Sequence, residues 1–585
     1  MSHHLSSKTK RLAIDTVLFG ISTFGSKILV FLLTPLYTAV LLTEEYGIAD
    51  LINTTVNLIY PVLTLAITDA TLRYALDKNC PKKAVLGNSM VITVLSILLL
   101  LAFYPIINMM NSEISVQLSR YWGYFVSTYA MYNIHLCFSN FVKGLGKTKL
   151  FAIQGIVQTL TVIICNIYFL LVAKTGLQGY LLSIIIGFAV PTVLMLFAGS
   201  IYKFLFPFKL DKKLLLDMLK YSIPMIPTLL AWSINMYINK YMLIGLLPAG
   251  EGLSASGIFS VANKIPSLLT AVLSIFTQAW QLSAISNVND SDESSYYTKV
   301  YGIMHIISLV GCLLIIPLSK IASSILFDPS YYSAWQHIPF LTLSAFFSCL
   351  CGFLASAFRA YKKTGQLFVS VAIGAVVNII LNLVLIESIG VVGASIATAA
   401  SFLVTWVVRM YTIQKLVEVK IHLPQTIATY VLAITGCILI VYDIPYAYLF
   451  YLLLCGAIIA FNYVFNLLDV EGLITVAENA AGGLSVGLAG GKAGLVLAFV
   501  QGFELAQQIA VVKAARLMLL YVLFHMDHLI SLKFLFHVLL LPLGHKGWRD
   551  YSRLFLFIAL FKKKQAETFS ACRTVEWIPF QPFSL

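Results

Sequence analysis

The chain has 585 residues, of which 59% are hydrophobic and only 11% are charged, and its mean hydropathy is +0.89. A soluble domain carries about 25% charged residues, so this composition excludes a soluble globular protein. The net charge of +14 at pH 7 does not indicate a nucleic-acid partner, because the basic residues fall in short segments between apolar stretches. These stretches are about 20 residues long without strict alternation, which predicts membrane helices rather than barrel strands.

The apolar stretches predict an all-α integral membrane protein with about fourteen transmembrane helices before residue 467. The first stretch is too long for a cleavable signal peptide and lacks a small-residue cleavage site, so we expect it to remain as the first span. The expected spans cover residues 14–42, 47–72, 85–110, 119–142, 150–173, 177–202, 222–247, 257–285, 300–327, 338–358, 367–387, 391–411, 424–442 and 445–467.

The basic residues alternate between the loops that join these spans. With the N-terminus in the cytoplasm, the inside loops carry 22 lysine and arginine residues, whereas the outside loops carry only Arg120 and Lys174. Cytoplasmic loops are enriched in lysine and arginine, so this alternation predicts the topology of all seven hairpins. One inside loop, 287–299, is acidic and has a single lysine, but acidic residues contribute little to this rule.

Two pairs of short motifs repeat at nearly the same offset along the chain. Span two begins with Gly47-Ile48 and reaches Asn53, and span eight begins with Gly257-Ile258 and reaches Asn263. Gly176 and Gly179 before span six correspond in the same way to Gly390 and Gly393 before span twelve. Such repeats predict two pseudo-symmetric six-helix halves in parallel orientation, with a substrate path between them.

The repeat and the loops divide the chain into five predicted parts. The two halves are joined by an amphipathic cytoplasmic linker and are followed by two additional spans. The segment after residue 467 contains a glycine-rich apolar stretch, further apolar stretches and three consecutive lysines, and we assign it no function. The predicted parts are residues 1–205, 206–221, 222–415, 416–467 and 468–585.

Three lysines are predicted to lie within spans. A lysine at the centre of a bilayer costs about 2.5–3.5 kcal/mol even on insertion scales, so an intramembrane lysine indicates a functional site. Lys27 lies near the middle of span one, and Lys240 and Lys264 lie about 10 Å deep on adjacent spans. One interpretation is a water-filled cavity in which these cations bind a phosphate or an acidic sugar. The alternative is that Lys240 and Lys264 extend to the membrane surface.

Other polar residues accompany these lysines. Asp69 and Arg73 are spaced i, i+4 and are predicted to form either a coupling or gate pair or a structural pair. We also expect four asparagines to line the cavity, although such residues equally hold membrane helices together. These are Asn53, Asn57, Asn239 and Asn263.

The chain has no pattern that predicts catalysis. No Walker A or HExxH sequence occurs, and the nine cysteines are scattered. We therefore expect a transporter rather than an enzyme, with no cofactor and no metal.

Several segments resemble Wzx-type polysaccharide flippases of the MATE-like superfamily that exports drugs, oligosaccharide-lipids and polysaccharides. The resemblance covers roughly residues 8–467. It rests on the loop Leu42-Thr43-Glu44-Glu45-Tyr46-Gly47, on Asn239-Lys240-Tyr241-Met242-Leu243, on 257–265, on Phe276-Thr277-Gln278-Ala279-Trp280 and on Pro329-Ser330-Tyr331-Tyr332-Ser333-Ala334.

This resemblance implies a multi-pass flippase of the bacterial inner membrane. Such proteins move undecaprenyl-diphosphate-linked oligosaccharide repeat units to the outer leaflet for assembly of O-antigen, capsule or exopolysaccharide. The implied partners are this glycolipid, membrane lipid, and the polysaccharide polymerase with its chain-length machinery. The family's cationic cavity implies roles for Lys27, Lys240 and Lys264, and an ion-coupled cycle would use Asp50 or Asp69 as its titrating group.

Two other functions stay open from the sequence. One is an ion-coupled exporter of drugs or metabolites from the same superfamily. The other is an O-antigen polymerase or membrane glycosyltransferase, which usually needs a large outside loop with catalytic carboxylates or arginines. The outside loops of this chain are short, which argues against the second alternative.

Overall fold

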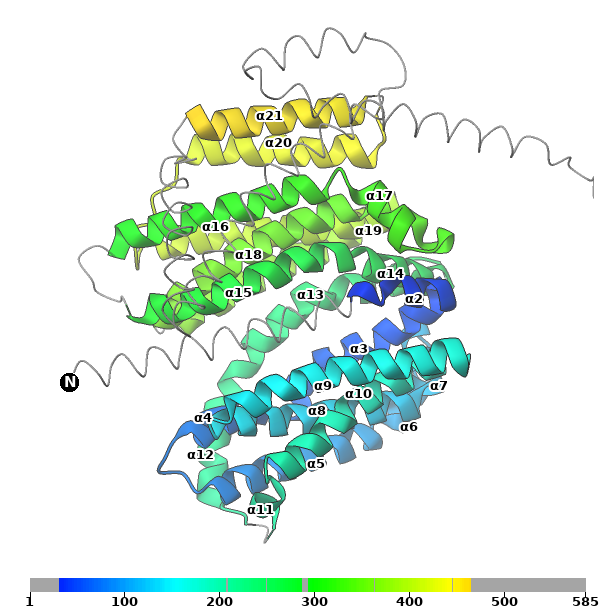
Figure 1. Ribbon diagram of the computed structural model, residues 1–585, viewed down its shortest axis with the longest axis vertical. Coiled ribbons are helices and arrows are strands. Elements are labelled where there is room, and N and C mark those ends of the chain that lie inside the picture. The colour runs from blue at the N-terminus through cyan, green and yellow to red at the C-terminus, as the bar shows by residue number, and fades with distance from the viewer. Residues whose placement is uncertain are drawn as a thin grey trace, which may run out of the picture. The chain divides into compact units, whose positions relative to one another are not determined.

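The computed structural model describes residues 31–464, except 207–208, 249, 287–292, 362 and 445. All described residues belong to one compact unit, Met1–Met518. Every regular element in the described part of the chain is a helix, which confirms the predicted all-α fold (Figure 1). Lys27, most of the first predicted span and the segment 468–585 lie outside the described residues.

In the first half, each predicted span from the second onward corresponds to one helix or to a consecutive pair. Span two, for example, is a pair bent by 63°, because Leu65 and Ala66 adopt positive φ between its two helices. The helices are α2 (Thr34–Val40), α3 (Thr43–Leu63), α4 (Ile67–Leu76), α5 (Lys82–Ala102), α6 (Tyr104–Met109), α7 (Glu113–Arg120), α8 (Trp122–Gly144), α9 (Thr148–Asn166), the π-helical turn η1 (Ile167–Val172) and α10 (Gly176–Ala198).

The rest of the described chain follows the same correspondence, except that one long helix covers the two predicted spans 367–387 and 391–411. Its elements are α11 (Tyr202–Leu205), α12 (Lys212–Ser222), the 3-10 turn η2 (Ile223–Met225), α13 (Ile226–Leu246), α14 (Glu251–Ala262), α15 (Lys264–Ser286), α16 (Glu293–Ile315), α17 (Ser319–Leu326), the 3-10 segment η3 (Pro329–Gln336), α18 (Ile338–Ala360), α19 (Thr364–Ile413), α20 (Leu423–Val441) and α21 (Ala447–Val464).

Within the described residues, eight helices are long and apolar enough to cross a membrane, or up to ten if each of two bent pairs forms one span. The figure of fourteen stays a prediction. Part of the difference comes from α19, which is counted once although its backbone is not helical at Ile389 and Gly390. That break separates the predicted spans 367–387 and 391–411.

Hydrogen bonds between loops support the predicted alternation of the loops. On the predicted inside, Lys147 donates to the carbonyl of Gly199, and Ser294 donates to that of Glu418. On the predicted outside, the Gly250 N–H donates to Glu113. Each of these contacts joins segments that the sequence assigns to the same side, with Gly199 at the end of the predicted span 177–202 and the other residues in loops.

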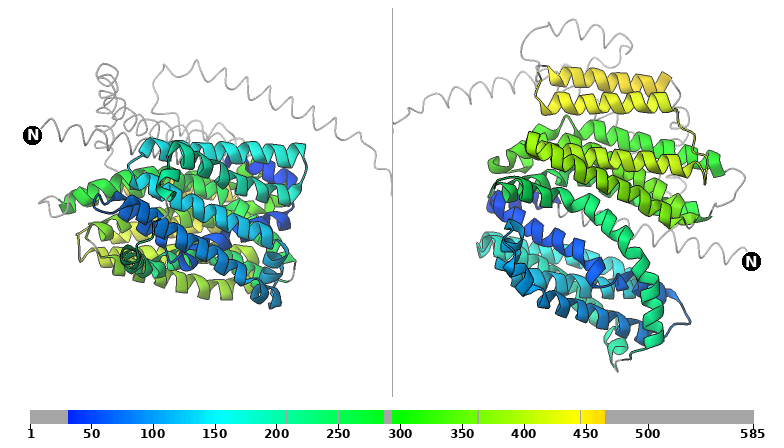
Figure 2. Two further views of the ribbon diagram at one scale, coloured as in Figure 1. Left: turned by 90° about the horizontal axis from the view of Figure 1, so that it is seen from below. Right: turned by 180° about the vertical axis from the view of Figure 1, so that it is seen from behind.

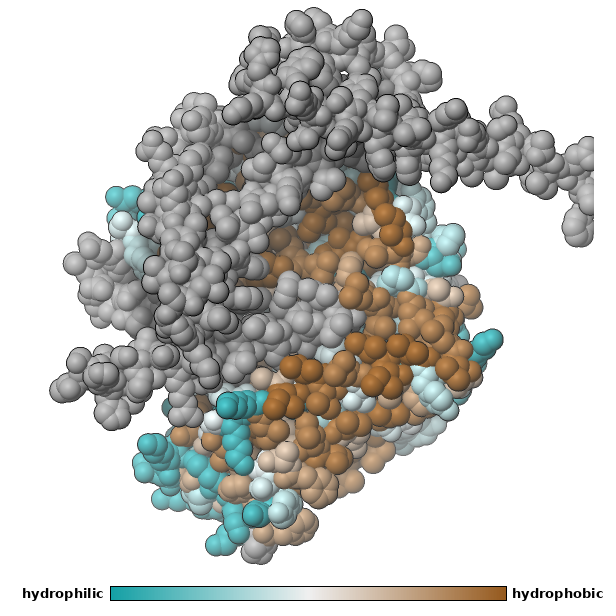
Figure 3. All heavy atoms as spheres, in the orientation of Figure 1, coloured by the Kyte–Doolittle hydropathy of each residue, from teal (hydrophilic) through white to brown (hydrophobic). Residues whose placement is uncertain are grey.

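Apolar side chains are exposed along the lengths of the helices, as expected of surfaces that face lipid. Examples are Leu98 on α5, Ile164 on α9 and Phe197 on α10, which are 55%, 64% and 65% exposed. Figure 3 shows these apolar surfaces in brown and hydrophilic residues gathered near the ends of α4, α11 and α12. The described part of the chain therefore presents a broad apolar face with polar ends.

The helices of each half pack mainly on one another. In the first half α10 packs on α8 and α9, and in the second half α18 packs on α15, α16 and α19. The helices α20 and α21 lie side by side, and α20 also packs on α18 (Figure 2). The linker helix α12 packs on α4 and α5, so it is attached to the first half. The boundaries of the predicted parts themselves stay predictions.

The repeated glycines serve the same purpose in both halves. Gly176 and Gly390 both have positive φ, at +55° and +60°, where glycine is favoured. A Cβ on Gly179 would lie 2.1 Å from Thr175 Oγ1, and one on Gly393 would lie 2.4 Å from the Leu385 oxygen. Both motifs therefore make a tight turn and then pack closely on the preceding segment.

Candidate functional site

The two halves meet where α3 packs against α14, and the contact is reciprocal. A Cβ on Gly47 would lie 2.1 Å from the backbone oxygen of Leu253, and a Cβ on Gly257 would lie 2.1 Å from that of Thr43. Thr43 and Leu253 are related by the same offset along the chain as the two glycines. Residues that are equivalent in the repeat therefore contact each other's helices in the same way. This reciprocity places a pseudo-two-fold axis between α3 and α14.

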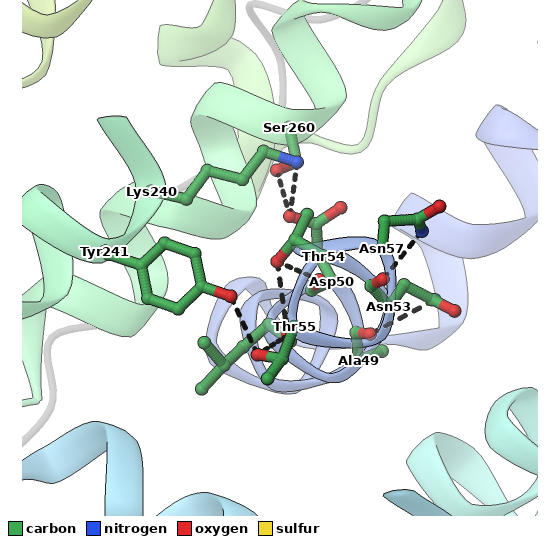
Figure 4. Close-up of polar contacts among 10 residues, drawn as sticks. Ala49, Asp50, Asn53, Thr54, Thr55, Asn57, Lys240, Tyr241 and Ser260 are labelled. Carbon is green, nitrogen blue, oxygen red and sulfur yellow. Dashed lines mark hydrogen bonds and ion pairs between the residues drawn. The ribbon is translucent and has the colours of Figure 1, made fainter. Parts of the chain in front are cut away.

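An ion pair lies at this contact, inside the predicted membrane region. Lys240 Nζ on α13 lies 2.6 Å from Asp50 Oδ2 on α3, with side chains only 9% and 17% exposed. Ser260 on α14 donates to the same Asp50 oxygen at 2.7 Å. Figure 4 shows Lys240 and Ser260 converging on Asp50 from the second half. Because Asp50 and Ser260 are related by the same offset as the repeated glycines, they are equivalent positions of the repeat facing each other.

Further polar contacts join the halves around this pair. Thr55 and Tyr241 share a hydrogen bond of 2.8 Å, and Thr43 and Ser254 share one of 3.0 Å. We call the set Thr43, Asp50, Thr55, Lys240, Tyr241, Ser254 and Ser260 the outer junction, because it lies toward the outer ends of α3, α13 and α14 in the predicted topology.

The segment after α17 extends the same connection. Tyr331 donates to the backbone oxygen of Leu41 at 3.0 Å, and the Asp328 N–H donates to the Thr38 hydroxyl at 3.2 Å. The Tyr331 ring also packs edge-on against Tyr46, with ring centroids 6.3 Å apart. These contacts link spans one and two to the second half on the predicted outside. The described arrangement therefore holds the halves together at that side.

Lys240 is an internal cation with a carboxylate partner, so the alternative that it extends to the membrane surface is wrong. Removing both charges from water is costly, and the pair compensates that cost only with good geometry and additional hydrogen bonds. Ser260 supplies one such bond, and the Lys240 ammonium lies 5.8 Å from the centre of the Tyr237 ring.

Lys264 is placed differently from Lys240. It is the first residue of α15, directly after a 40° bend between α14 and α15, and it is half-buried. It lies close enough to Tyr180 for electrostatic interaction and forms no ion pair with any described residue. Of the two described lysines predicted to bind an anion, Lys264 therefore has the more available charge.

The four predicted asparagines do not share one environment. Asn53 and Asn57 are half-buried and donate to the carbonyls one turn earlier on α3, at 3.2 and 2.8 Å (Figure 4). Asn263 is exposed at the bend after α14. Asn239 is buried, and its Oδ1 accepts a bond of 2.7 Å from Asn382 on α19.

Asn239 therefore belongs to a polar contact within the second half. Neighbouring hydrogen bonds complete this contact: Asn378 donates to the Asn235 oxygens, and Ser401 donates to Asn235 Oδ1. Adjacent residues of a helix point about 100° apart, so Asn239 faces α19 while Lys240 faces α3. The prediction that Asn239 lines the cavity is not supported by this placement.

The predicted pair of Asp69 and Arg73 is not an ion pair in the described part of the chain. Arg73 is exposed, and its guanidinium lies 4.5 Å from the centre of the Tyr221 ring of the linker helix. Asp69 is half-buried near Tyr60 and Tyr132, whose rings pack edge-on at 5.4 Å. The cation–aromatic contact attaches Arg73 to α12 instead.

Sequence reasoning missed the partners of Lys240. Asp50 was considered only as a titrating group, and Ser260, Tyr237 and Tyr241 were not singled out. The repeat offset that relates Asp50 to Ser260 was the available signal. No group of three or more histidine, cysteine, aspartate or glutamate side chains among the described residues is placed to hold a metal ion.

Comparison with known proteins gives related sequences over part of the chain. A family model described as "Polysaccharide biosynthesis protein" matches residues 12–281. A membrane protein of Methanocaldococcus jannaschii is 25% identical over 292 residues, which is 47% of this chain and 67% of that protein. The "probable low-salt glycan biosynthesis flippase" of Haloferax volcanii is 24% identical over 200 residues, 33% of this chain and 42% of that protein. The chain thus matches less than half the length of this flippase.

Solved structures share the fold over most of the described chain. The lipid II flippase MurJ in an inward closed conformation matches with a TM-score of 0.58 and 16% identity, over 77% of this chain and 98% of that one. A multidrug resistance MATE family transporter in its inward-facing conformation matches with a TM-score of 0.55 and 13% identity, over 67% and 95%. The family match and the shared fold confirm the resemblance found in the loop motifs.

Proposed function

We propose that the chain, which resembles polysaccharide flippases of the MATE-like superfamily, moves a glycan linked to a polyisoprenyl diphosphate across its membrane. The expected carrier is undecaprenyl diphosphate in a bacterial inner membrane, and the expected product is a precursor of O-antigen, capsule or exopolysaccharide. The observation that carries this proposal is the outer junction, where a buried cation lies between two repeated halves. Transporters built from repeats bind their substrate between the repeats, and intramembrane lysines mark the site of an anionic group.

The proposed mechanism is alternating access. The halves rock against each other, so the outer junction must separate before the substrate can leave on the outside. The linker moves with the first half, because Asn88 of α5 both donates to the Asp211 carbonyl and accepts from its N–H. The hinge then falls at η2, where Pro224 and Pro227 interrupt the hydrogen-bonded helix that leads into α13.

The diphosphate is proposed to bind the lysines, and the sugar to bind polar and aromatic side chains below the junction. Lys240 and Lys264 offer ammonium groups from the second half, and Lys27 is the proposed cation of the first half. Asn53 and Asn57 retain exposed surface, as do Tyr60 and Tyr237. Amide and phenol groups of this kind bind sugar hydroxyls, while the aromatic faces bind the apolar face of a sugar ring.

Deletion of the gene in its host tests this proposal. Surface polysaccharide is followed by gel electrophoresis, and polyisoprenyl-linked oligosaccharides by mass spectrometry. A flippase predicts loss of surface polymer together with accumulation of repeat units on the inner leaflet. Complementation by Lys264→Ala is expected to fail, whereas Lys320→Ala, which changes a lysine near the outer surface, is the matched control.

A small-molecule exporter is the second candidate, because the multidrug transporter shares the fold. Unchanged glycans together with altered sensitivity to cationic drugs in the deletion strain would favour this candidate. A polymerase or glycosyltransferase would instead leave repeat units on the outer leaflet or prevent their completion. Labelling intact cells with a membrane-impermeant reagent before mass spectrometry identifies the leaflet and so distinguishes all three.

A further inference from the structure

Both contacts that the second half makes with Asp50 end on a single carboxylate oxygen. Lys240 Nζ and Ser260 Oγ approach Asp50 Oδ2 at 2.6 and 2.7 Å. Asp50 belongs to α3 in the first half, whereas Lys240 and Ser260 belong to α13 and α14 in the second. Departure of one carboxylate therefore breaks an ion pair and a hydrogen bond between the halves at once.

We propose that Asp50 is an internal competitor of the anionic substrate for Lys240, and that exchange of these two anions releases the outer junction. The proposal rests on the proposed function, because it takes the diphosphate of the glycolipid as the incoming anion. It adds a positioning role for Asp50: the carboxylate holds Lys240 and the two halves in place until the substrate arrives.

The burial of Lys240 explains why the exchange would be obligatory. The Lys240 side chain is 9% exposed, and a buried ammonium without a counterion is strongly unfavourable. Asp50 can therefore leave at low cost only when another anion takes its place. An empty transporter would keep its outer junction closed, and a loaded one would open it.

After the exchange, Lys240 and Asp50 would have different partners. Lys240 would keep a counterion, since the diphosphate replaces the carboxylate. Asp50 would move with α3 away from α13 and α14, and opening of the outer side would expose it to water. The half-buried side chains Asn53, Asn57 and Tyr237 lie toward the predicted cytoplasmic side of the pair. An incoming headgroup would therefore approach Lys240 from the cytoplasmic side, along side chains that already retain exposed surface.

A disulfide across the outer junction reports whether it is closed. The Thr43 and Ser254 hydroxyls lie 3.0 Å apart, so Thr43→Cys with Ser254→Cys places two thiols at cross-linking distance. The probe is undecaprenyl diphosphate added to the purified full chain, with neutral undecaprenol as the matched ligand control. Single-cysteine variants measure cross-linking that involves the native cysteines.

In the otherwise unchanged chain, undecaprenyl diphosphate is expected to lower the cross-link yield, and undecaprenol is not. Asp50→Asn is expected to lower the yield without any ligand and to bind undecaprenyl diphosphate at least about fivefold more tightly, because a competitor has been removed. Ser260→Ala, which removes the hydrogen bond but leaves the ion pair, is the matched control and is expected to retain the response to ligand.

A charge-reversed double variant distinguishes loss of the ion pair from failure to fold. Asp50→Lys with Lys240→Asp keeps opposite charges across the junction and is expected to restore the cross-link lost in Asp50→Asn. An unrestored cross-link in a protein that remains monodisperse would overturn the proposal.

Failure of the inference is distinguishable from failure of the proposed function. If undecaprenyl diphosphate binds the parent and Asp50→Asn with equal affinity and the cross-link is unchanged, Asp50 is not a competitor although the glycolipid still binds. If undecaprenyl diphosphate binds neither protein more tightly than undecaprenol does, the proposed substrate is wrong and the inference falls with it.

Discussion

The helices α3 and α14 are equivalent elements of the two halves, yet they differ in the residues that would perform transport. Both carry a glycine at the crossing point, and each glycine meets a backbone oxygen of the other helix at the same distance. Three residues after each glycine the first half has Asp50 and the second has Ser260. The repeat therefore preserves the glycine packing of the junction. The junction carries its carboxylate only in the first half, because the equivalent position in the second half is a serine.

The two helices also bend at different depths. α3 continues for 21 residues and ends before the break at Leu65 and Ala66, whereas α14 ends after 12 residues at Asn263. Consequently Asn53 lies within a continuous helix, while its equivalent Asn263 forms the C-terminal cap of α14. One sequence position thus serves as a side-chain contact in one half and as a bend in the other.

The largest expected effect comes from breaking the ion pair. Lys240→Met leaves the half-buried Asp50 carboxylate with the Ser260 hydrogen bond but without its counterion, which is expected to cost stability at the lower end of about 3–5 kcal/mol. The double variant Lys240→Met with Asp50→Asn removes both charges and is expected to recover most of that loss. Chemical denaturation in detergent measures both. Equal instability of the single and double variants would show that the two side chains do not interact.

Exchanging the equivalent residues tests the pseudo-symmetry directly. Asp50→Ser with Ser260→Asp moves the carboxylate to the second half but keeps it beside Lys240, so we expect stability within about 1–3 kcal/mol of the parent, the usual cost of reshaping a packed site. Asp50→Ser alone is the control and should be the less stable protein. If the exchange is no better than this control, the two positions are not equivalent.

The glycine contact predicts matched losses in the two halves. Gly47→Ala and Gly257→Ala each force a methyl group against a backbone oxygen, and such overpacking typically costs about 1–3 kcal/mol. Thermal unfolding should show similar decreases for both, because the contact is reciprocal. Gly123→Ala on α8, where the added carbon meets nothing within 4 Å, is the control and should not decrease the unfolding temperature.

A variant within the second half is expected to leave the junction intact. Asn239→Leu removes one acceptor of the Asn382 amide, which keeps the two Asn378 oxygens as acceptors. The variant should therefore cost about 0.5–1.5 kcal/mol, the usual net contribution of one hydrogen bond. The cross-link between cysteines at positions 43 and 254 should nevertheless form as in the parent. A reduced cross-link would place Asn239 in the connection between the halves after all.

The smallest expected effect concerns the segment after α17, in which the Asp328 N–H donates to Thr38 of α2. The N–H and hydroxyl of Ser330 both donate to the exposed Asp328 carboxylate and hold its pKa below its ordinary value of 3.8. A lowered pKa in the folded state adds stability at higher pH, and that contribution is lost as the pH falls through the folded pKa. We expect a small decrease in unfolding temperature below pH 3.8 that Asp328→Ala abolishes. An unchanged pH profile in this variant would contradict the assignment.

The sequence predicted the all-helical fold, because apolar length reflects the local cost of crossing a membrane; the count of fourteen spans and the sides on which the loops lie stay predictions. The repeated motifs predicted two halves but not that Gly47 and Gly257 meet, because that contact depends on how the fold places the two helices. The sequence did not predict that Lys240 pairs with Asp50, because the pairing depends on three helices brought together by the fold. The i, i+4 spacing of Asp69 and Arg73 was misleading, because Tyr221 of the linker offers the arginine another partner.

The most direct test of the account is to lock the outer junction and measure transport. A disulfide between Thr43→Cys and Ser254→Cys, formed by oxidant and opened by reductant, would fix the halves at the contact that joins them. We predict that oxidation stops the appearance of lipid-linked oligosaccharide on the outer leaflet and that reduction restores it. Undiminished export by the oxidised, fully cross-linked protein would contradict transport by separation of the two halves at this junction.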